Sequence, residues 1–135
     1  YTSRVAVSPE DTRIPMVAVV DDDPTVIIIL TRILEASGYA VQVHGSGEAL
    51  LETADSHTYD LVCLDLGPPG IDGLETLARF TQAGNRTPVI LFTASADEVR
   101  EQAMAAGAFR CVSKTGGWGE LRAAVAQALQ GRSNI

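Results

Sequence analysis

The sequence predicts an α/β fold of the (βα)5 type, in which five parallel strands form a doubly wound sheet with helices on both faces. Short apolar runs alternate along the chain with longer segments of helical periodicity, and the connections between them are short. Such alternation of strands and helices produces a parallel sheet. The apolar runs are continuous, which is typical of strands buried on both faces.

The first half of the chain contains the first two strand–helix units. The first strand is expected at residues 16–20 (MVAVV), a short continuous apolar run. Pro24 opens the first helix, because proline is well tolerated in a first helical turn. This helix is expected to continue to residue 37 and to end before Gly38. The second strand and the second helix are expected at residues 40–44 and 47–54.

The second half contains the other three units. The remaining strands are expected at residues 61–64, 89–92 and 109–113, and the remaining helices at residues 72–82, 97–106 and 118–130. Gly84, Gly107 and Gly131 follow these three helices and are expected to end them, because glycine is common just past a helix C-terminus.

The chain of 135 residues is long enough for one domain with a hydrophobic core. No apolar run approaches the ~20 residues of a membrane span, and the N-terminal residues lack the features of a secretory signal. We expect the domain at residues 16–131, with residues 1–15 as a flexible lead-in or linker remnant and residues 132–135 as a tail. Because the chain begins with Tyr1, we expect a fragment or a processed chain.

Charge and cysteine content narrow the class of protein. The net charge of −7 argues against nucleic-acid binding by this domain. Cys63 and Cys111 lie in different apolar runs and have the spacing neither of a disulfide framework nor of a metal site. We expect two buried free thiols and a cytoplasmic location.

Polar residues with chemical function follow four of the five predicted strands. Three aspartates at residues 21–23 follow the first strand, and Asp65 follows the third. Thr93 follows the fourth strand and Lys114 the fifth. In an open parallel sheet, ligands bind beyond the carboxyl ends of the strands. We therefore expect one site at this edge of the sheet.

These groups suit phosphoryl transfer. Carboxylates about 4 Å apart repel by about 4 kcal/mol at an effective dielectric of 20, so the cluster needs a cation, and oxygen ligands select Mg²⁺ or Mn²⁺. Lys114 adds a fixed positive charge and Thr93 a hydroxyl donor, which together can neutralise a phosphoryl group. A carboxylate can be the acceptor. The histidines are expected elsewhere: His44 on the surface, and His57 near the opposite end of the sheet.

The sequence resembles the receiver domain of response regulators in bacterial two-component signalling. The matching segments are residues 19–24 (VVDDDP), 64–73 (LDLGPPGIDG), 89–95 (VILFTAS) and 105–114 (AAGAFRCVSK). Each is weak alone, but together they occur in order at the correct strand ends. The resemblance implies a flavodoxin-like fold with strand order 2-1-3-4-5. It also implies phosphoryl uptake from a phosphohistidine of a sensor kinase or phosphotransfer protein, with no enzymatic activity beyond self-phosphorylation and autodephosphorylation.

The resemblance assigns a role to each residue of the predicted site. Asp65 is the phosphoacceptor. Thr93 and Lys114 bind the phosphoryl oxygens, and the backbone N–H of Ala94 adds a donor. The metal ligands are expected to be the carboxylates of Asp21, Asp22 and Asp65 and the backbone carbonyl of Gly67. Asp23 has no assigned role in the family; its negative charge is expected to interact favourably with the dipole at the N-terminus of the first helix. Pro69 and Gly73 match residues that shape the family's loop after the third strand.

Three features depart from the family pattern, one of which is the pair Pro68–Pro69, expected to stiffen the loop after Asp65. The family usually has an aromatic residue three positions before the lysine, coupled to the threonine, whereas Cys111 occupies that position here. Phe109 is expected on the same face of the strand as Cys111. Thr93 and Cys111 are thus the predicted switch positions. Many members follow the lysine with a cis-proline. Thr115 takes that place here, and a non-proline cis bond costs about 2.5–4 kcal/mol, so we expect a trans bond.

Two helices offer candidate interaction surfaces. In the first helix, the face expected to pack on the sheet contains Val26, Ile29, Leu30, Ile33 and Leu34. Ile28 falls on the opposite face and is a candidate for docking a kinase or phosphotransfer helix, although single exposed apolar residues are common. The last helix has a core stripe of Leu121, Val125 and Leu129. Its alanines would permit a homodimer through the fourth helix, fifth strand and fifth helix, the surface that the family switches.

Three alternative functions remain. DDDPTV at residues 21–26 also matches the start of haloacid-dehalogenase-type phosphatases, but those need an acidic pair after the lysine, and only Glu120 follows Lys114. The second is a flavodoxin-like cofactor domain, but its phosphate would lie against the three aspartates at residues 21–23, which would repel it. The third alternative is a receiver that is not phosphorylated and acts only as an interaction module, which Cys111 keeps open.

Overall fold

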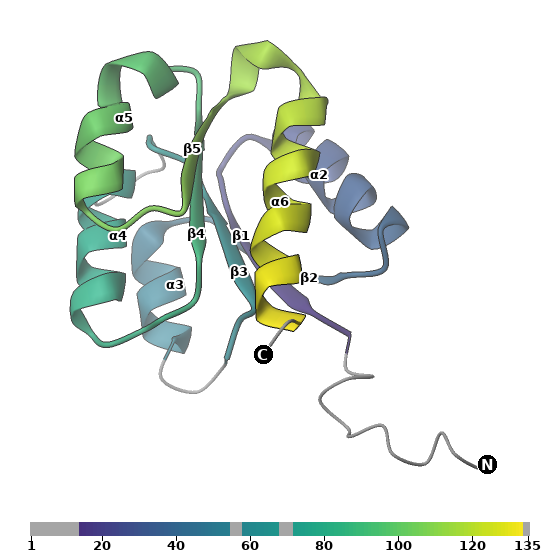
Figure 1. Cartoon of the computed structure of the whole chain (residues 1–135), viewed down its shortest axis with the longest axis horizontal. Coiled ribbons are helices and arrows are strands. Elements are labelled where there is room, and N and C mark those ends of the chain that lie inside the picture. The colour runs from purple at the N-terminus through teal and green to yellow at the C-terminus, as the bar shows by residue number, and fades with distance from the viewer. Residues whose placement is uncertain (1–13, 55–57, 68–71, 134–135) are drawn as a thin grey trace.

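The computed structural model describes residues 14–54, 58–67 and 72–133 of the chain. Five parallel strands form one sheet in the order β2-β1-β3-β4-β5, as predicted (Figure 1). The strands are β1 (Met16–Val20), β2 (Ala40–His44), β3 (Leu61–Leu64), β4 (Val89–Thr93) and β5 (Arg110–Ser113). The helices are α2 (Pro24–Ala36), α3 (Gly47–Thr53), α4 (Gly73–Gln82), α5 (Ala96–Ala105) and α6 (Trp118–Ser133), with a short 3-10 helix η2 (Lys114–Gly116).

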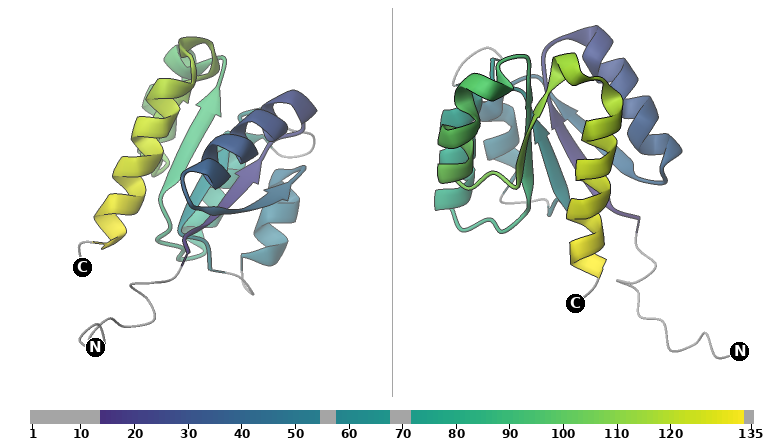
Figure 2. Two further views of the ribbon diagram at one scale, coloured as in Figure 1. Left: turned by 90° about the vertical axis from the view of Figure 1, so that its right-hand side faces the viewer. Right: turned by 45° about the horizontal axis from the view of Figure 1, so that its top comes forward.

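The helices form two layers around the sheet. Figures 1 and 2 show α2 and α6 on one face and α3, α4 and α5 on the other. We call the core under the first layer the α2–α6 cluster; it includes Val17, Leu30, Leu34, Phe92, Val112, Leu121 and Val125. The α3–α5 cluster lies on the other face and includes Val20, Leu50, Tyr59, Leu64, Leu77, Phe80 and Cys111. Alternate residues of each strand enter opposite clusters, as the pleat requires.

Local signals explain why the helices begin and end near the predicted positions. Asp23 is the N-cap of α2, and its side chain accepts a hydrogen bond from the Thr25 N–H at 2.9 Å. Ser46 and Asp72 cap α3 and α4 in the same way. Gly38 follows α2 with a φ of 95°, a conformation that favours glycine. All predicted bounds but one agree with the structure within one residue.

The exception is the last helix. It was expected to end at Gly131, but α6 continues to Ser133. One glycine costs a helix only about 1 kcal/mol relative to alanine, so it does not have to end α6. The core stripe of α6 is confirmed, since Leu121, Val125 and Leu129 are all buried. In α2, Leu30 and Leu34 are buried as expected.

Two other expectations about side chains are wrong. His44 is buried instead of lying on the surface. Its Nε2 lies 3.0 Å from the hydroxyl of Tyr59, a residue of the α3–α5 cluster that covers this face of the outer strand. Phe109 and Cys111 do not share a face: Phe109 packs on the α2–α6 cluster and Cys111 belongs to the other. β5 begins only at Arg110, so strand alternation does not extend back to Phe109.

Several expectations fall partly or wholly outside the described residues. Of the predicted lead-in, only Ile14 and Pro15 are described; the Pro15 carbonyl accepts a hydrogen bond from the Ala40 N–H at 2.9 Å. His57, Pro68 and Pro69 lie outside the described residues. Within the part of the chain that the structure describes, no helix is long and apolar enough to cross a membrane.

Candidate functional site

Parallel pairing brings the first two carboxylates of the site together. β1 and β3 are neighbours, with Val20 in register with Leu64, so both strands end at the same level. The Asp65 N–H donates to the Val20 carbonyl at 2.9 Å, so the residue after β3 lies beside the residue after β1. Asp21 and Asp65 therefore meet at the carboxyl edge of the sheet because of the strand register.

Lys114 joins these two carboxylates. Its Nζ lies 3.0 Å from Asp21 Oδ2 and 3.0 Å from Asp65 Oδ1. Lys114 comes directly after Ser113, which is in register with Thr93 on the neighbouring strand β4. Only 3% of the Asp21 side chain and 13% of the Asp65 side chain are exposed, against 20% of Lys114. The ion pairs are therefore largely shielded from solvent, where their electrostatic interaction is strong.

A third carboxylate completes an acidic cluster. One oxygen each of Asp21, Asp22 and Asp65 lie within 4.8 Å of one another. Asp22 is exposed. The second oxygen of Asp21 accepts a hydrogen bond from the Asp23 N–H at 3.0 Å, which fixes the orientation of that carboxylate. Three oxygen ligands at this spacing fit a hard divalent cation. Lys114 alone does not neutralise the three carboxylates, so negative charge remains for such a cation to offset.

The environment shifts the pKa of both partners in the central ion pair. Burial raises the pKa of the Asp65 carboxyl above its ordinary value; the negative charge of Asp21 adds to this, and Lys114 acts in the opposite direction. Burial also disfavours the charged form of Lys114. The hydrogen bonds and charges of Asp21 and Asp65 outweigh that effect and raise the pKa of Lys114. Lys114 is therefore a fixed cation, while the charge on Asp65 is destabilised.

Thr93 lies at the end of the neighbouring strand. It is the last residue of β4 and is buried. Its hydroxyl accepts a hydrogen bond from the Ser95 N–H at 3.2 Å. Ala94, the predicted backbone donor, is exposed at the same edge of the sheet. Gly67, the predicted carbonyl ligand, is exposed two residues after Asp65. The structure thus places the predicted residues of the site along one edge of the sheet.

Two predicted residues lie away from the cluster. Ile28 is 51% exposed on the outer side of α2, as predicted from the helical angle. Cys111 is buried, and its Sγ lies 3.7 Å from the Ala96 carbonyl oxygen at the start of α5. Arg100 of α5 donates to the Cys111 carbonyl at 3.1 Å. Cys111 therefore contacts α5, and no described contact joins it to Thr93.

Sequence reasoning missed three residues next to the site. The Phe92 ring lies under Lys114, with Nζ 5.7 Å from its centroid, and the Trp118 ring packs on Phe92. Gly73, expected only as a loop-shaping residue, lies against the backbone of Asp65. Phe92 and Trp118 could have been suspected only from their spacing to Thr93 and Lys114. The Lys114–Thr115 bond is trans as expected, since no described peptide bond is cis.

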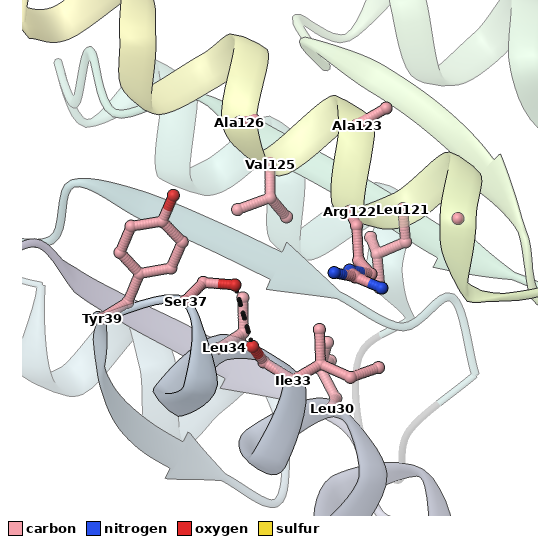
Figure 3. Close-up of a pocket in the computed structure, with 11 residues that line it drawn as sticks. Leu30, Ile33, Leu34, Ser37, Tyr39, Leu121, Arg122, Ala123, Val125 and Ala126 are labelled. Atoms are coloured by element: carbon pink, nitrogen blue, oxygen red, sulfur yellow. Dashed lines mark hydrogen bonds between the residues drawn. The ribbon is translucent and has the colours of Figure 1, made fainter.

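A groove lies apart from the acidic cluster, between α2 and α6. It has a volume of about 430 Å³ and shares no lining residue with the cluster. Figure 3 shows Leu30, Leu34 and Val125 along it, with Tyr39 at one end and Arg122 nearer the other. Its lining is mostly aliphatic, in contrast to the charged site.

Comparisons with known proteins find relatives of one family. A family model for the response regulator receiver domain matches residues 17–126. DNA-binding response regulator MtrA of Mycolicibacterium smegmatis is 36% identical over 89 residues, which are 66% of this chain and 39% of MtrA. Regulatory protein AtoC of Escherichia coli is 35% identical over 121 residues, 88% of this chain and 26% of AtoC. The chain thus spans about a third of the length of the first curated relatives that it matches.

A solved structure has the same fold. Response regulator protein TrrA of Thermotoga maritima, in complex with Mg²⁺-BeF, is 32% identical with a TM-score of 0.79, and the match covers 86% of this chain and all of that one. The receiver domain of DrrB, described as BeF3-activated, is 29% identical with a TM-score of 0.77, covering 87% of this chain and 99% of that one.

Proposed function

The chain belongs to the response regulator receiver domain family, and on that premise we propose that it accepts a phosphoryl group on Asp65. One observation carries the proposal: the Lys114 ammonium lies 3.0 Å from a carboxylate oxygen of both Asp21 and Asp65. A fixed cation beside a partly buried carboxylate is what an acceptor of a charged phosphoryl group needs.

The proposed step is a transfer from phosphohistidine. A carboxylate oxygen of Asp65 attacks the phosphorus, the new P–O bond forms as the P–N bond breaks, and the imidazole nitrogen keeps the electron pair of the broken bond. Lys114 offsets negative charge on the phosphoryl oxygens throughout. The Thr93 hydroxyl and the Ala94 N–H lie on the neighbouring strand end and donate to the same oxygens. The raised pKa of Lys114 keeps it charged at neutral pH.

The carboxylates of Asp21, Asp22 and Asp65, with the Gly67 carbonyl, would hold the metal ion. Spacing within 4.8 Å and an all-oxygen ligand set fit Mg²⁺ or Mn²⁺. A bound divalent cation would supply charge neutralisation to the carboxylates and the phosphoryl oxygens. The Mg²⁺-BeF complex of TrrA supports this choice, because beryllofluoride resembles a phosphoryl group in shape and charge.

We further propose that this domain is the receiver part of a longer regulator, since the chain spans only about a third of its curated relatives. The phosphodonor would be a sensor histidine kinase or a phosphotransfer protein. Phosphorylation would alter the surface of α5, β5 and α6, through which a homodimer would form, and nucleic-acid binding would belong to another domain. Two buried free cysteines support a cytoplasmic location.

Incubation with acetyl phosphate tests the acceptor role. With Mg²⁺, intact-mass spectrometry should find the mass of one added phosphoryl group, which chelation of the metal or Asp65→Asn should abolish. Asp97→Asn is the matched control, because Asp97 is an exposed partner in a surface ion pair and should leave uptake unchanged. A folded, unmodified wild type would contradict the proposal. Labelling that survives Asp65→Asn would favour attack by Asp21, as in the haloacid-dehalogenase alternative.

The alternative of a receiver that is not phosphorylated has one observation in its favour, the break in the family pattern at Cys111. Addition of beryllofluoride with Mg²⁺ distinguishes the two. An acceptor should give chemical-shift changes around Asp65, Thr93 and Lys114 that depend on both reagents. An interaction module should give no change beyond that caused by Mg²⁺ alone.

A further inference from the structure

We propose that Phe92 and Trp118 are positioning residues, which hold the Lys114 ammonium where it meets Asp21 and Asp65; this inference rests on the proposed acceptor function. Lys114 Nζ lies 5.7 Å from the centroid of the Phe92 ring. The Phe92 and Trp118 rings lie 5.4 Å apart at 50°, in a tilted arrangement. The three side chains therefore form a continuous series from the acidic cluster to the first residue of α6.

The chain around Lys114 gives it little local restraint. A lysine side chain has four rotatable bonds, and fixing it costs up to about 2 kcal/mol of conformational entropy. Lys114 begins the three-residue helix η2, which ends at Gly116 and is followed by Gly117 with a φ of 88°. Apart from the ion pairs of Lys114 itself, the described side-chain hydrogen bonds of this turn join Ser113 and Thr115. Two consecutive glycines then precede Trp118, so the backbone alone does not fix the position of Lys114.

Trp118 is the first large side chain after Lys114, and it anchors this glycine-rich connection. It packs against the α2–α6 cluster. Phe92 is a buried member of that cluster, only 3% exposed, so its ring is restrained by the surrounding core. The sheet thereby supplies a rigid surface under the lysine. Trp118, the first residue of α6, packs against the Phe92 ring and so connects the start of this helix to the core.

The ring also interacts with the charge of the lysine. A cation within about 6 Å of a ring centroid is attracted to the ring face, more strongly where water is excluded. Lys114 is partly shielded, with 20% of its side chain exposed. The Phe92 ring and the two carboxylates all attract the ammonium, so each of them contributes to its position. Removal of the ring should therefore loosen Lys114 without altering the carboxylates.

Loss of either ring is therefore expected to weaken binding of the phosphoryl group while leaving binding of the metal nearly unchanged. Lys114 is proposed to bind the phosphoryl oxygens, whereas Asp21, Asp22 and Asp65 bind the metal. In Phe92→Leu and in Trp118→Leu, affinity for beryllofluoride at saturating Mg²⁺ should fall about 3- to 10-fold. Affinity for Mg²⁺ alone should change by less than about 2-fold. Trp118→Phe keeps an aromatic ring on Phe92 and should restore binding to near the wild-type value.

Calorimetric titration of the full chain with Mg²⁺, and then with beryllofluoride, provides both affinities. Phe80→Leu is the matched control, since Phe80 is as buried as Phe92 but lies in the α3–α5 cluster. It should lose comparable stability in urea and bind beryllofluoride as the wild type does. Normal beryllofluoride binding by both leucine variants overturns the inference, as does an equal loss in Phe80→Leu. Failure of the wild type to bind beryllofluoride overturns the proposed function, and this inference with it.

Discussion

Gly73 lies directly against the backbone of Asp65. A β-carbon built on Gly73 would be 2.5 Å from the Asp65 carbonyl oxygen and 2.7 Å from the Cα of Leu66. The Gly73 N–H donates to the Leu66 carbonyl at 2.6 Å. The first residue of α4 therefore fixes the backbone at Asp65, and the close approach leaves no room for a side chain.

Gly73→Ala should disturb both stability and the site. A methyl group here meets backbone atoms, which cannot rotate away, so the free energy of unfolding should fall by about 1–3 kcal/mol. The displaced backbone carries Asp65, so affinity for Mg²⁺ should fall as well. Urea unfolding and Mg²⁺ titration measure the two effects. Gly45→Ala is the control, since a β-carbon there meets nothing within 4 Å. An alanine variant with unchanged unfolding and Mg²⁺ affinity would contradict the prediction.

In the metal-free protein, the contribution of Asp65 to stability should fall as the pH rises from the unfolded-state pKa of this carboxyl to its native pKa. Burial, with help from Asp21, raises that pKa above the ordinary value of 3.8. The folded state then binds more protons than the unfolded state between the two pKa values, so stability falls with rising pH over that window. Asp65→Asn cannot ionise and should lack this contribution.

Urea midpoints in chelator, from about pH 4 to pH 7, measure the effect as the difference between wild type and Asp65→Asn. The difference cancels the titration of carboxylates remote from the site. At neutral pH the asparagine variant should be the more stable, because one charge is gone from a cluster whose oxygens lie within 4.8 Å. A difference that is independent of pH would show that Asp65 ionises as easily in the folded chain as in the unfolded one.

Mg²⁺ should stabilise the chain, and Asp22 should be needed for the full effect. A ligand that binds only the folded state adds about 2.7 kcal/mol at 100 times its Kd. Asp22 is exposed, so Asp22→Asn should leave the metal-free midpoint nearly unchanged and reduce the increase caused by Mg²⁺. Asp23→Asn is the control, because asparagine caps a helix as well as aspartate does. An equal response to Mg²⁺ in Asp22→Asn would remove Asp22 from the ligand set.

Local features made most of the fold predictable. Continuous apolar runs located the strands, and the first helix was located by Pro24 at its start and Gly38 after its end. The site followed from topology: parallel strands end at one edge, so residues after different strands had to meet there. Asp21, Asp65 and Lys114 do meet, although 93 residues separate the first from the last. The identity of these residues was read from the sequence, and their proximity was inferred from the parallel sheet.

Features that depend on packing between distant elements were not predictable. His44 ends an outer strand of the sheet, a place where a surface position is expected. Its burial depends on packing against Tyr59, which comes from a distant part of the chain. Phe109 lies one residue before β5, so alternation assigned it to the wrong face. The close approach of Gly73 to Asp65 depends on how the start of α4 packs against the end of β3, which no local pattern encodes.

Cys63 should resist alkylation until the chain unfolds. It lies in β3, in the middle of the sheet, and burial raises the pKa of its thiol to about 12. The thiolate is the reactive form, so at pH 8 the Cys63 side chain is almost entirely in the unreactive thiol form. Iodoacetamide labelling of Cys111→Ser isolates this thiol and should be slow in buffer and rapid in urea. Because β3 is a central strand, labelling in buffer should require global opening, so Mg²⁺ should slow it further. Fast labelling of the folded chain, or labelling unaffected by Mg²⁺, would place the opening of β3 outside the cooperative unit that contains Asp65.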